Sequence, residues 1–177
     1  MAPYYNAAMI NFEQKYAALL AQADAKTPAA VAGMRLCFEA LALAAAIDRD
    51  CADRLAAHGL SEGRFVLLFL LAEAKGGLSP HELAERAGVT RGTITGLLDG
   101  LERAALARRF SHDVDRRKLT VQLTPKGRAL ARKLVAEHSQ WIGAVFSGFT
   151  QSERALLSRL LTKAYLQTDT GARAGKP

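Results

Sequence analysis

The sequence predicts a mostly α-helical fold with a small two-stranded β wing, in a chain of 177 residues. Three observations lead to this prediction. Apolar residues recur every three to four positions over most of the chain, as they do on one face of a helix. Ser, Thr, Pro and Gly stand where such helices should begin and end. Only residues 107–110 and 119–123, on either side of a polar loop, have the pattern of strands.

The composition is that of a folded globular chain, with half of the residues apolar and 23% charged. The two cysteines cannot form a disulfide scaffold, and the first residues lack the charged start and apolar run of a signal peptide. The uninterrupted apolar runs 40–47 and 65–72 are far shorter than the roughly 20 residues that span a bilayer. We therefore expect a cytoplasmic protein with no membrane partner.

Positive charge is concentrated in the middle of the chain. The net charge is 24 − 17 = +7, whereas residues 86–133 alone hold 12 basic and 4 acidic side chains, a net +8. A basic block inside a folded segment is expected of a protein that binds a polyanion such as DNA. An ordinary solvated face would account for the charge equally well.

The outer parts of the chain read as long helices. Residues 1–28 form an N-terminal extension whose helix covers about 6–24, and the helix that follows has apolar residues on more than one stripe. Such a helix must be covered on several sides, by its own chain and by a second copy. We therefore expect residues 29–60 and 125–167 of a 29–177 domain to be dimerisation helices. The Gly- and Ala-rich tail 168–177 is expected to be disordered.

The central segment, 61–124, has the pattern of a winged helix-turn-helix. Ser79 and Glu82 form a capping box at the start of one short helix, and Thr90 caps the next after the turn Gly88-Val89-Thr90. The motif needs a small residue where the helices cross, a glycine in the turn and two apolar residues on the second helix. These positions hold Ala84, Gly88, Ile94 and Leu97. The alternative is a pair of packed core helices that binds no DNA.

The second helix of this motif is the expected recognition helix. With its apolar residues buried, its outward face is formed by Arg91, Gly92, Thr95, Gly96 and Asp99. The N-terminal end of such a helix enters the major groove, and the two glycines allow close approach of the backbone to DNA. The candidates for contacts with bases or phosphates are therefore Thr90, Arg91, Thr93 and Thr95.

Two stretches, LSPHELAERAGVTRGTITGLLDGLERAALARR and DVDRRKLTVQLTPKGRAL, resemble the DNA-binding core of the MarR family of bacterial transcriptional regulators. The order of helices extends this resemblance to about residues 29–167. It implies a homodimeric repressor that binds a pseudo-palindromic operator in double-stranded DNA. An arginine at the wing tip of such proteins enters the minor groove and an aspartate orients it. Arg117, with Arg116 beside it, and Asp115 match these roles.

The sequence departs from the family at residue 105, where an alanine replaces the glycine that usually ends the recognition helix. The resemblance also implies a small aromatic carboxylate or phenolic effector, bound between the dimerisation helices and the DNA-binding lobe. Candidate ligand residues are Arg35, Phe38, Arg64 and Phe65.

Cysteine chemistry offers an alternative signal. One branch of the family senses peroxides through a cysteine on its first helices, so Cys37 or Cys51 could carry a thiol-based response. A protein-interaction module without DNA binding is the other alternative. The spacing of His and Cys predicts no metal site, and the sequence contains no pattern of an enzyme active site or of a cofactor site.

Overall fold

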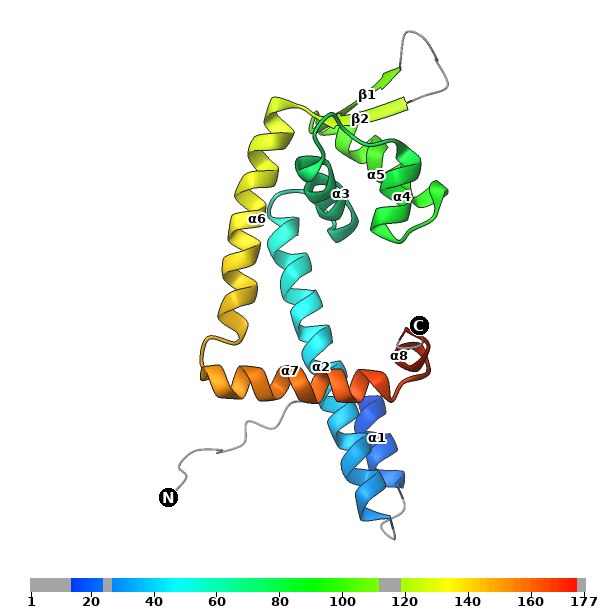
Figure 1. Cartoon of the computed structure of the whole chain (residues 1–177), viewed down its shortest axis with the longest axis vertical. Helices are drawn as coiled ribbons and strands as arrows, with labels where there is room; N and C mark the ends of the chain where they lie inside the picture. Colours follow the sequence, from blue (N-terminus) through cyan, green and yellow to red (C-terminus); the bar gives the residue numbers. More distant parts are fainter. Residues whose placement is uncertain (1–13, 24–26, 112–118, 175–177) are drawn as a thin grey trace. The chain divides into compact units, whose positions relative to one another are not determined.

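The computed structural model describes residues 14–23, 27–111 and 119–174 (Figure 1). The chain divides into two compact units, residues 1–67 and 68–177. In the described ranges the elements are α1 (Gln14–Gln22), α2 (Pro28–Ala56), α3 (Glu62–Glu73), α4 (Pro80–Ala87), α5 (Arg91–Arg103), β1 (Ala107–Ser111), β2 (Leu119–Leu123), α6 (Pro125–Val145), α7 (Gln151–Leu166) and α8 (Asp169–Ala174). The predicted fold class, mostly helical with one small antiparallel sheet, is confirmed.

The first unit contains α1, α2 and the start of α3. The ring of Tyr16 in α1 stacks on Phe38 of α2, with centroids 4.6 Å apart, and the Lys15 ammonium lies 4.8 Å from the Tyr16 ring centroid. The remaining residues predicted for the first helix, 6–13 and 24, lie outside the described residues. Helix α2 ends before Gly59, whose φ of 68° is the left-handed conformation that glycine adopts without strain.

Helix α2 exposes much of its apolar surface. Within it only Leu55 is buried, and Leu36, Leu41 and Leu43 are among the exposed large hydrophobic residues. By length and composition alone, α2 is long and apolar enough to cross a membrane, although its uninterrupted apolar runs are short. A helix buried between two subunits has the same composition, because its apolar faces are also removed from water.

The second unit is built around the packing of α4 and α5 against the β1–β2 sheet. Its core consists largely of aliphatic side chains, including Leu83, Ile94, Leu98, Leu101, Leu106, Val121 and Leu123. Strands β1 and β2 are antiparallel, from the pair Ala107↔Leu123 to the pair Ser111↔Leu119.

A short bridge adds Leu78 to the sheet. The Leu78 N–H donates to the Val121 carbonyl at 3.1 Å, and the Val121 N–H donates back to the Leu78 carbonyl at 2.8 Å. A Cβ on the preceding Gly77 would lie 2.4 Å from the Val121 carbonyl oxygen, closer than real Cβ atoms approach. Glycine is therefore required for the chain to run this close to β2.

The last helices begin at threonine caps. Thr124 caps α6 and Thr150 caps α7, where Glu153 completes a capping box. The expectation of disorder in the whole tail 168–177 is wrong, because residues 169–174 form α8. The Thr168 hydroxyl accepts the Gly171 N–H at 3.0 Å and donates to the Tyr165 carbonyl at 2.8 Å. This local cap starts a helix that the Gly- and Ala-rich composition did not suggest.

Candidate nucleic-acid interface

Helix α4 is fixed at both ends. The Ser79 hydroxyl accepts the Glu82 N–H at 3.2 Å, and the Glu82 carboxylate accepts the Ser79 N–H at 2.8 Å. These bonds favour the charged carboxylate, so they hold the pKa of Glu82 below its ordinary value. At the other end, Gly88 has a φ of 65° and turns the chain toward α5. The predicted start, capping box and glycine turn of this helix are confirmed.

Helix α5 packs against α4 through the residues that the motif requires. Ile94, Leu98 and Leu101 are buried on α5, and Ala84 is buried on α4. Leu97, predicted to face inward with them, is half-buried. Because these side chains lie on one side of the helix, the opposite side of α5 faces outward. The structure therefore has the predicted helix-turn-helix.

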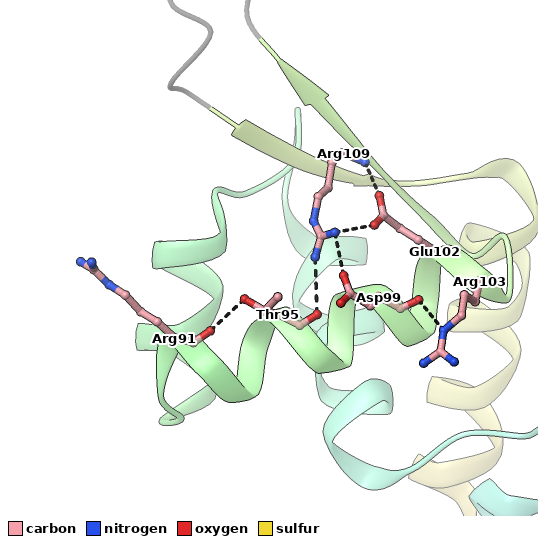
Figure 2. A network of polar contacts seen from close by, with 6 residues as sticks. All are labelled: Arg91, Thr95, Asp99, Glu102, Arg103 and Arg109. Atoms are coloured by element: carbon pink, nitrogen blue, oxygen red, sulfur yellow. Dashed lines mark hydrogen bonds and ion pairs between the residues drawn. The ribbon is translucent and has the colours of Figure 1, made fainter.

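The threonines at the start of α5 mostly use their hydroxyl groups within the helix. Thr90 accepts the Thr93 N–H at 3.3 Å, and the two threonine hydroxyls lie 2.9 Å apart. The Thr95 hydroxyl donates to the Arg91 carbonyl at 3.1 Å. Arg91 is exposed, and its side chain extends away from the helix start (Figure 2). Of the four candidates on α5, Arg91 therefore offers the longest reach and the only positive charge.

Two glycines leave part of the outer face of α5 bare. Gly92 and Gly96 are both exposed. A Cβ added to Gly96 would meet nothing within 4 Å, and one added to Gly92 would meet only the Thr90 hydroxyl at 3.9 Å. Packing inside the described chain therefore does not require either glycine. Their place on the outer face allows a partner to approach the helix backbone closely.

The wing candidates Asp115, Arg116 and Arg117 lie outside the described residues. The strands on either side are described, and the register pairs Ser111 with Leu119 at the ends nearest the intervening segment. The antiparallel pair of strands that the sequence predicts on either side of residues 112–118 is therefore confirmed.

A network around Arg109 on β1 was not predicted (Figure 2). The guanidinium donates to Asp99 at 2.8 Å and to Glu102 at 2.7 Å, both on α5. The Arg109 N–H donates to the other oxygen of Glu102 at 3.0 Å. The sequence gives no direct signal for these contacts, because they depend on how the strand lies over the helix. The acidic residues at 99 and 102, one helical turn apart within a basic block, were the available hint.

The ligand candidates all belong to the first unit. Arg35 is exposed on α2, and Phe38, one turn later, is half-buried against Tyr16. Arg64 and Phe65 are half-buried neighbours on α3. The Nε atom of Arg64 is buried and has no hydrogen-bond partner among the described residues. Of the four, Arg64 is therefore the one with a polar atom that lacks a partner.

The chain matches the family model for the MarR family over residues 60–119. The transcriptional regulator TtmR of Methylorubrum extorquens is 34% identical over 142 residues, which cover 80% of this chain and 70% of TtmR. The transcriptional repressor YetL of Bacillus subtilis is 43% identical over 107 residues, 60% of this chain and 64% of YetL. This chain belongs to the MarR family.

Solved structures agree with this membership. Streptococcus pneumoniae FabT in complex with DNA is 27% identical, with a TM-score of 0.52 over 60% of this chain and 73% of that chain. The Staphylococcus aureus MepR–DNA complex has a TM-score of 0.60 over 69% of this chain and 90% of that chain. At 21% identity, MepR shows the shared fold. As a member of this family, whose relatives given above are named transcriptional regulators, the chain is a transcriptional regulator of MarR type and not an enzyme.

Proposed function

We propose that this MarR-family chain is a homodimeric repressor that binds a pseudo-palindromic DNA operator and leaves it when a small effector binds. The observation that carries the proposal is the outer face of α5. This face is exposed, its two glycines, Gly92 and Gly96, have no side chains, and Arg91 gives it a positive charge at the start of the helix. The Ser79–Glu82 capping box fixes the start of α4 and Thr90 caps the start of α5, so both helices of the motif begin at defined residues. Such a face suits the major groove, where the helix start lies closest to the bases.

The homodimer is supported by apolar surface that one chain leaves uncovered. Five large hydrophobic side chains of α7 are exposed, and α2 exposes three leucines; those of α7 are Leu156, Leu160, Leu161, Tyr165 and Leu166. Exposed apolar patches of this kind mark protein interfaces. Two copies also provide the two reading heads that a pseudo-palindrome requires. Because the operator is in the bacterial cytoplasm, the proposal places the protein there.

The effector class is supported by Arg64. A buried guanidinium nitrogen without a partner is unfavourable, and a carboxylate or phenolate would satisfy it. Phe65 beside it suits an aromatic ring. A relative in Escherichia coli, 32% identical over 59% of this chain, is named the homoprotocatechuate degradative operon repressor. Homoprotocatechuate is an aromatic carboxylic acid with phenolic groups, the class that we propose here.

The thiol-based alternative is weaker for Cys51 than for Cys37. Burial, together with Glu62 and Asp48 nearby, raises the pKa of the Cys51 thiol. Thiols react as thiolates, so this environment makes Cys51 less reactive at neutral pH. Cys37 is exposed on α2 and remains the candidate for a redox response. Blocking the thiols should leave effector release unchanged if the ligand mechanism holds.

The test of the DNA-binding face is Arg91→Ala. Binding to a duplex enriched by the wild-type protein from a random pool should weaken, because the only cation on the first turns of α5 is lost. Fluorescence anisotropy over a range of salt concentrations measures this. The salt slope should fall by about 1 for each phosphate contact removed. Unchanged binding would remove α5 from the interface.

The effector proposal is tested by thermal shift with a panel of aromatic carboxylates and phenols. A ligand that binds only the native state raises the apparent stability by RT ln(1 + [L]/Kd). The shift should be lost in Arg64→Gln and kept in the control Arg49→Gln, which changes an exposed arginine of α2 that is not a ligand candidate. If no compound shifts the melting temperature, or if both variants respond like the wild type, the proposed role of Arg64 is wrong.

A further inference from the structure

The free edge of strand β1 is covered by a side chain of the recognition helix. Arg109 pairs with Val121 of β2, whose own N–H and carbonyl are bonded to Leu78 on its other side. Arg109 and Val121 therefore form a non-hydrogen-bonded pair, in which the Arg109 N–H points away from β2. It donates to Glu102 Oε1 at 3.0 Å, so a carboxylate of α5 takes the place of a further strand.

The side chain of Arg109 makes a second set of contacts with the same helix (Figure 2). Its Nη1 atom lies 2.7 Å from Glu102 Oε2 and 2.8 Å from Asp99 Oδ1. Its Nη2 atom lies 3.5 Å from the Thr95 carbonyl oxygen, one further turn toward the start of α5. Residues 95, 99 and 102 lie on one side of the helix, so a single guanidinium spans two of its turns.

These contacts are only partly shielded from water. The side chain of Arg109 is 26% exposed, that of Glu102 is 30% exposed and that of Asp99 is 49% exposed. Ion pairs at this depth contribute little to global stability. They do restrict geometry, because Glu102 holds the backbone and the side chain of Arg109 at the same time. The network is therefore better suited to fixing an angle between two elements than to holding the fold together.

We propose that Arg109 and Glu102 are positioning residues that brace β1, and the wing that it begins, on the recognition helix. This inference rests on the proposed function, since it concerns how DNA is recognised. Helix and wing must contact the duplex together, and a ribbon held in place before binding loses less conformational freedom on binding. Glu102 is essential to this brace although it carries the charge that phosphates repel.

The competing explanation is that Arg109 itself binds a phosphate. Both explanations predict that Arg109→Gln weakens DNA binding, so this variant alone does not separate them. Glu102 does, because Glu102→Gln removes a negative charge beside α5. Simple electrostatics then predicts tighter binding to any DNA, whereas loss of the brace predicts weaker binding to the preferred sequence. Glu102→Asp keeps the charge and shortens the reach, so electrostatics predicts no change there.

The probes are a duplex that the wild-type protein enriches from a random pool and a scrambled duplex of equal composition. We expect Glu102→Gln and Glu102→Asp each to weaken binding to the enriched duplex by about threefold to tenfold. Binding to the scrambled duplex should not weaken, because nonspecific binding depends on charge and phosphate contacts: Glu102→Asp should leave it within about twofold of the wild type, and Glu102→Gln should leave it equal or tighter. The matched control is Glu85→Gln, which removes the charge of an exposed side chain on α4.

A double variant measures whether the two residues act as a unit. Arg109→Gln combined with Glu102→Gln should be no weaker than Arg109→Gln alone, since the brace is already lost. Circular dichroism checks that each variant keeps its helices. Glu102 variants that bind the enriched duplex as well as the wild type, or additive losses in the double variant, would overturn the inference alone. A wild type that enriches no sequence would overturn the proposed function and this inference with it.

Discussion

Ala105 adopts a conformation that favours glycine, with a φ of 57°. It lies in a Schellman motif at the end of α5, where the Leu106 N–H bonds to the Leu101 carbonyl and the Ala105 N–H to the Glu102 carbonyl. Its Cβ should cost about 1 kcal/mol there. Ala105→Gly should therefore raise the free energy of unfolding, measured by denaturant titration, and leave DNA affinity unchanged. If Ala105→Gly lowered the free energy of unfolding, the proposed backbone strain at Ala105 would be wrong.

Gly96 should lower the stability of the fold while allowing close contact between α5 and DNA. Glycine in an exposed helix interior costs about 0.5–1 kcal/mol relative to alanine, and nothing in the described chain would meet the added Cβ. Gly96→Ala should therefore raise the unfolding free energy by that amount and weaken DNA binding, because the methyl group separates helix and duplex. Gly143→Ala on α6, also free of close neighbours, is the control; light scattering checks that it assembles as the wild type does, and it should then stabilise without affecting DNA binding. An unchanged affinity in Gly96→Ala would mean that no duplex approaches this turn.

The wing residues remain a prediction at the same scale. Arg117→Ala should weaken operator binding and reduce the salt slope by about 1 per contact, or about 2 per dimer. Asp115→Ala removes a negative charge, so electrostatics alone predicts tighter binding. If Asp115 orients Arg117 in a minor groove, specific binding should fall instead. Anisotropy titrations of both variants distinguish the two results.

Sequence reasoning at the residue scale succeeded where the cause is local. The turn at Gly88 follows from residues within one helical turn, whereas the unusual backbone of Ala105 was suggested by the resemblance to a family that usually has glycine there. The contacts of Arg109 could not be predicted in this way, because ion pairs over 7 and 10 residues depend on the position of a strand over a helix. The hydroxyl contacts of Thr93 and Thr95 were missed for another reason. The sequence shows that these threonines face outward on a recognition helix, which suggests contacts with DNA, but it does not show that their hydroxyl groups bond within the helix.

The carboxylates of Glu82 and Glu153 complete the N-terminal caps of α4 and α7. Hydrogen bonds from Ser79 lower the pKa of Glu82, and those from Thr150 lower the pKa of Glu153. Because the folded pKa is depressed, this stabilisation is fully present above the ordinary value of 4.5 and is lost as the pH falls through the folded pKa. The stability gap between wild type and Glu82→Gln should therefore be constant near neutral pH and narrow below about pH 4.5.

Urea titrations at several pH values measure that gap. Glu85→Gln is the matched control, because Glu85 lies on the same helix and is exposed. Its effect on stability should not show the same narrowing. A gap for Glu82→Gln that stays constant down to pH 3 would mean that the charged carboxylate contributes nothing to the cap.

At the scale of elements, most boundaries follow from caps. The starts of α4, α5, α6 and α7 were predicted to within a residue or so, because Ser, Thr and Pro mark them, and both strands were predicted from their residue pattern on either side of a polar loop. The exception is α8, where Thr168 gives a cap signal inside a segment whose composition suggests disorder. The junction of α5 and α6 was also not predicted. There Thr124 Oγ1 donates to the Ala105 carbonyl at 2.8 Å, and Lys126 Nζ donates to the Ala104 carbonyl at 3.0 Å.

The whole molecule should be a dimer. The exposed leucines of α2 and α7 are too many for a stable solvated surface, and burying them between two copies removes them from water. Light scattering at micromolar concentration should give twice the chain mass of 19.0 kDa. Leu160→Glu, which places a charge in this surface, should shift the protein toward monomer. A monomeric wild type would contradict the proposed assembly.

Dimerisation and effector binding are the features that a single sequence predicts least well. The pattern on α2 predicts that a second copy covers one of its apolar stripes, but the residues that meet across such an interface are not neighbours in the sequence. The DNA-binding lobe is different, because its helix-turn-helix is specified by residues close together in the chain.

The most direct test of the central claim is selection of bound duplexes from a random pool by the wild-type protein, followed by sequencing. If a homodimer reads DNA with α5 and the wing, the enriched sequences should contain two inverted half-sites. Their centres should lie about one helical turn, or 10–10.5 base pairs, apart. A pool with no enriched sequence, or with a single half-site and no symmetry, would contradict the account.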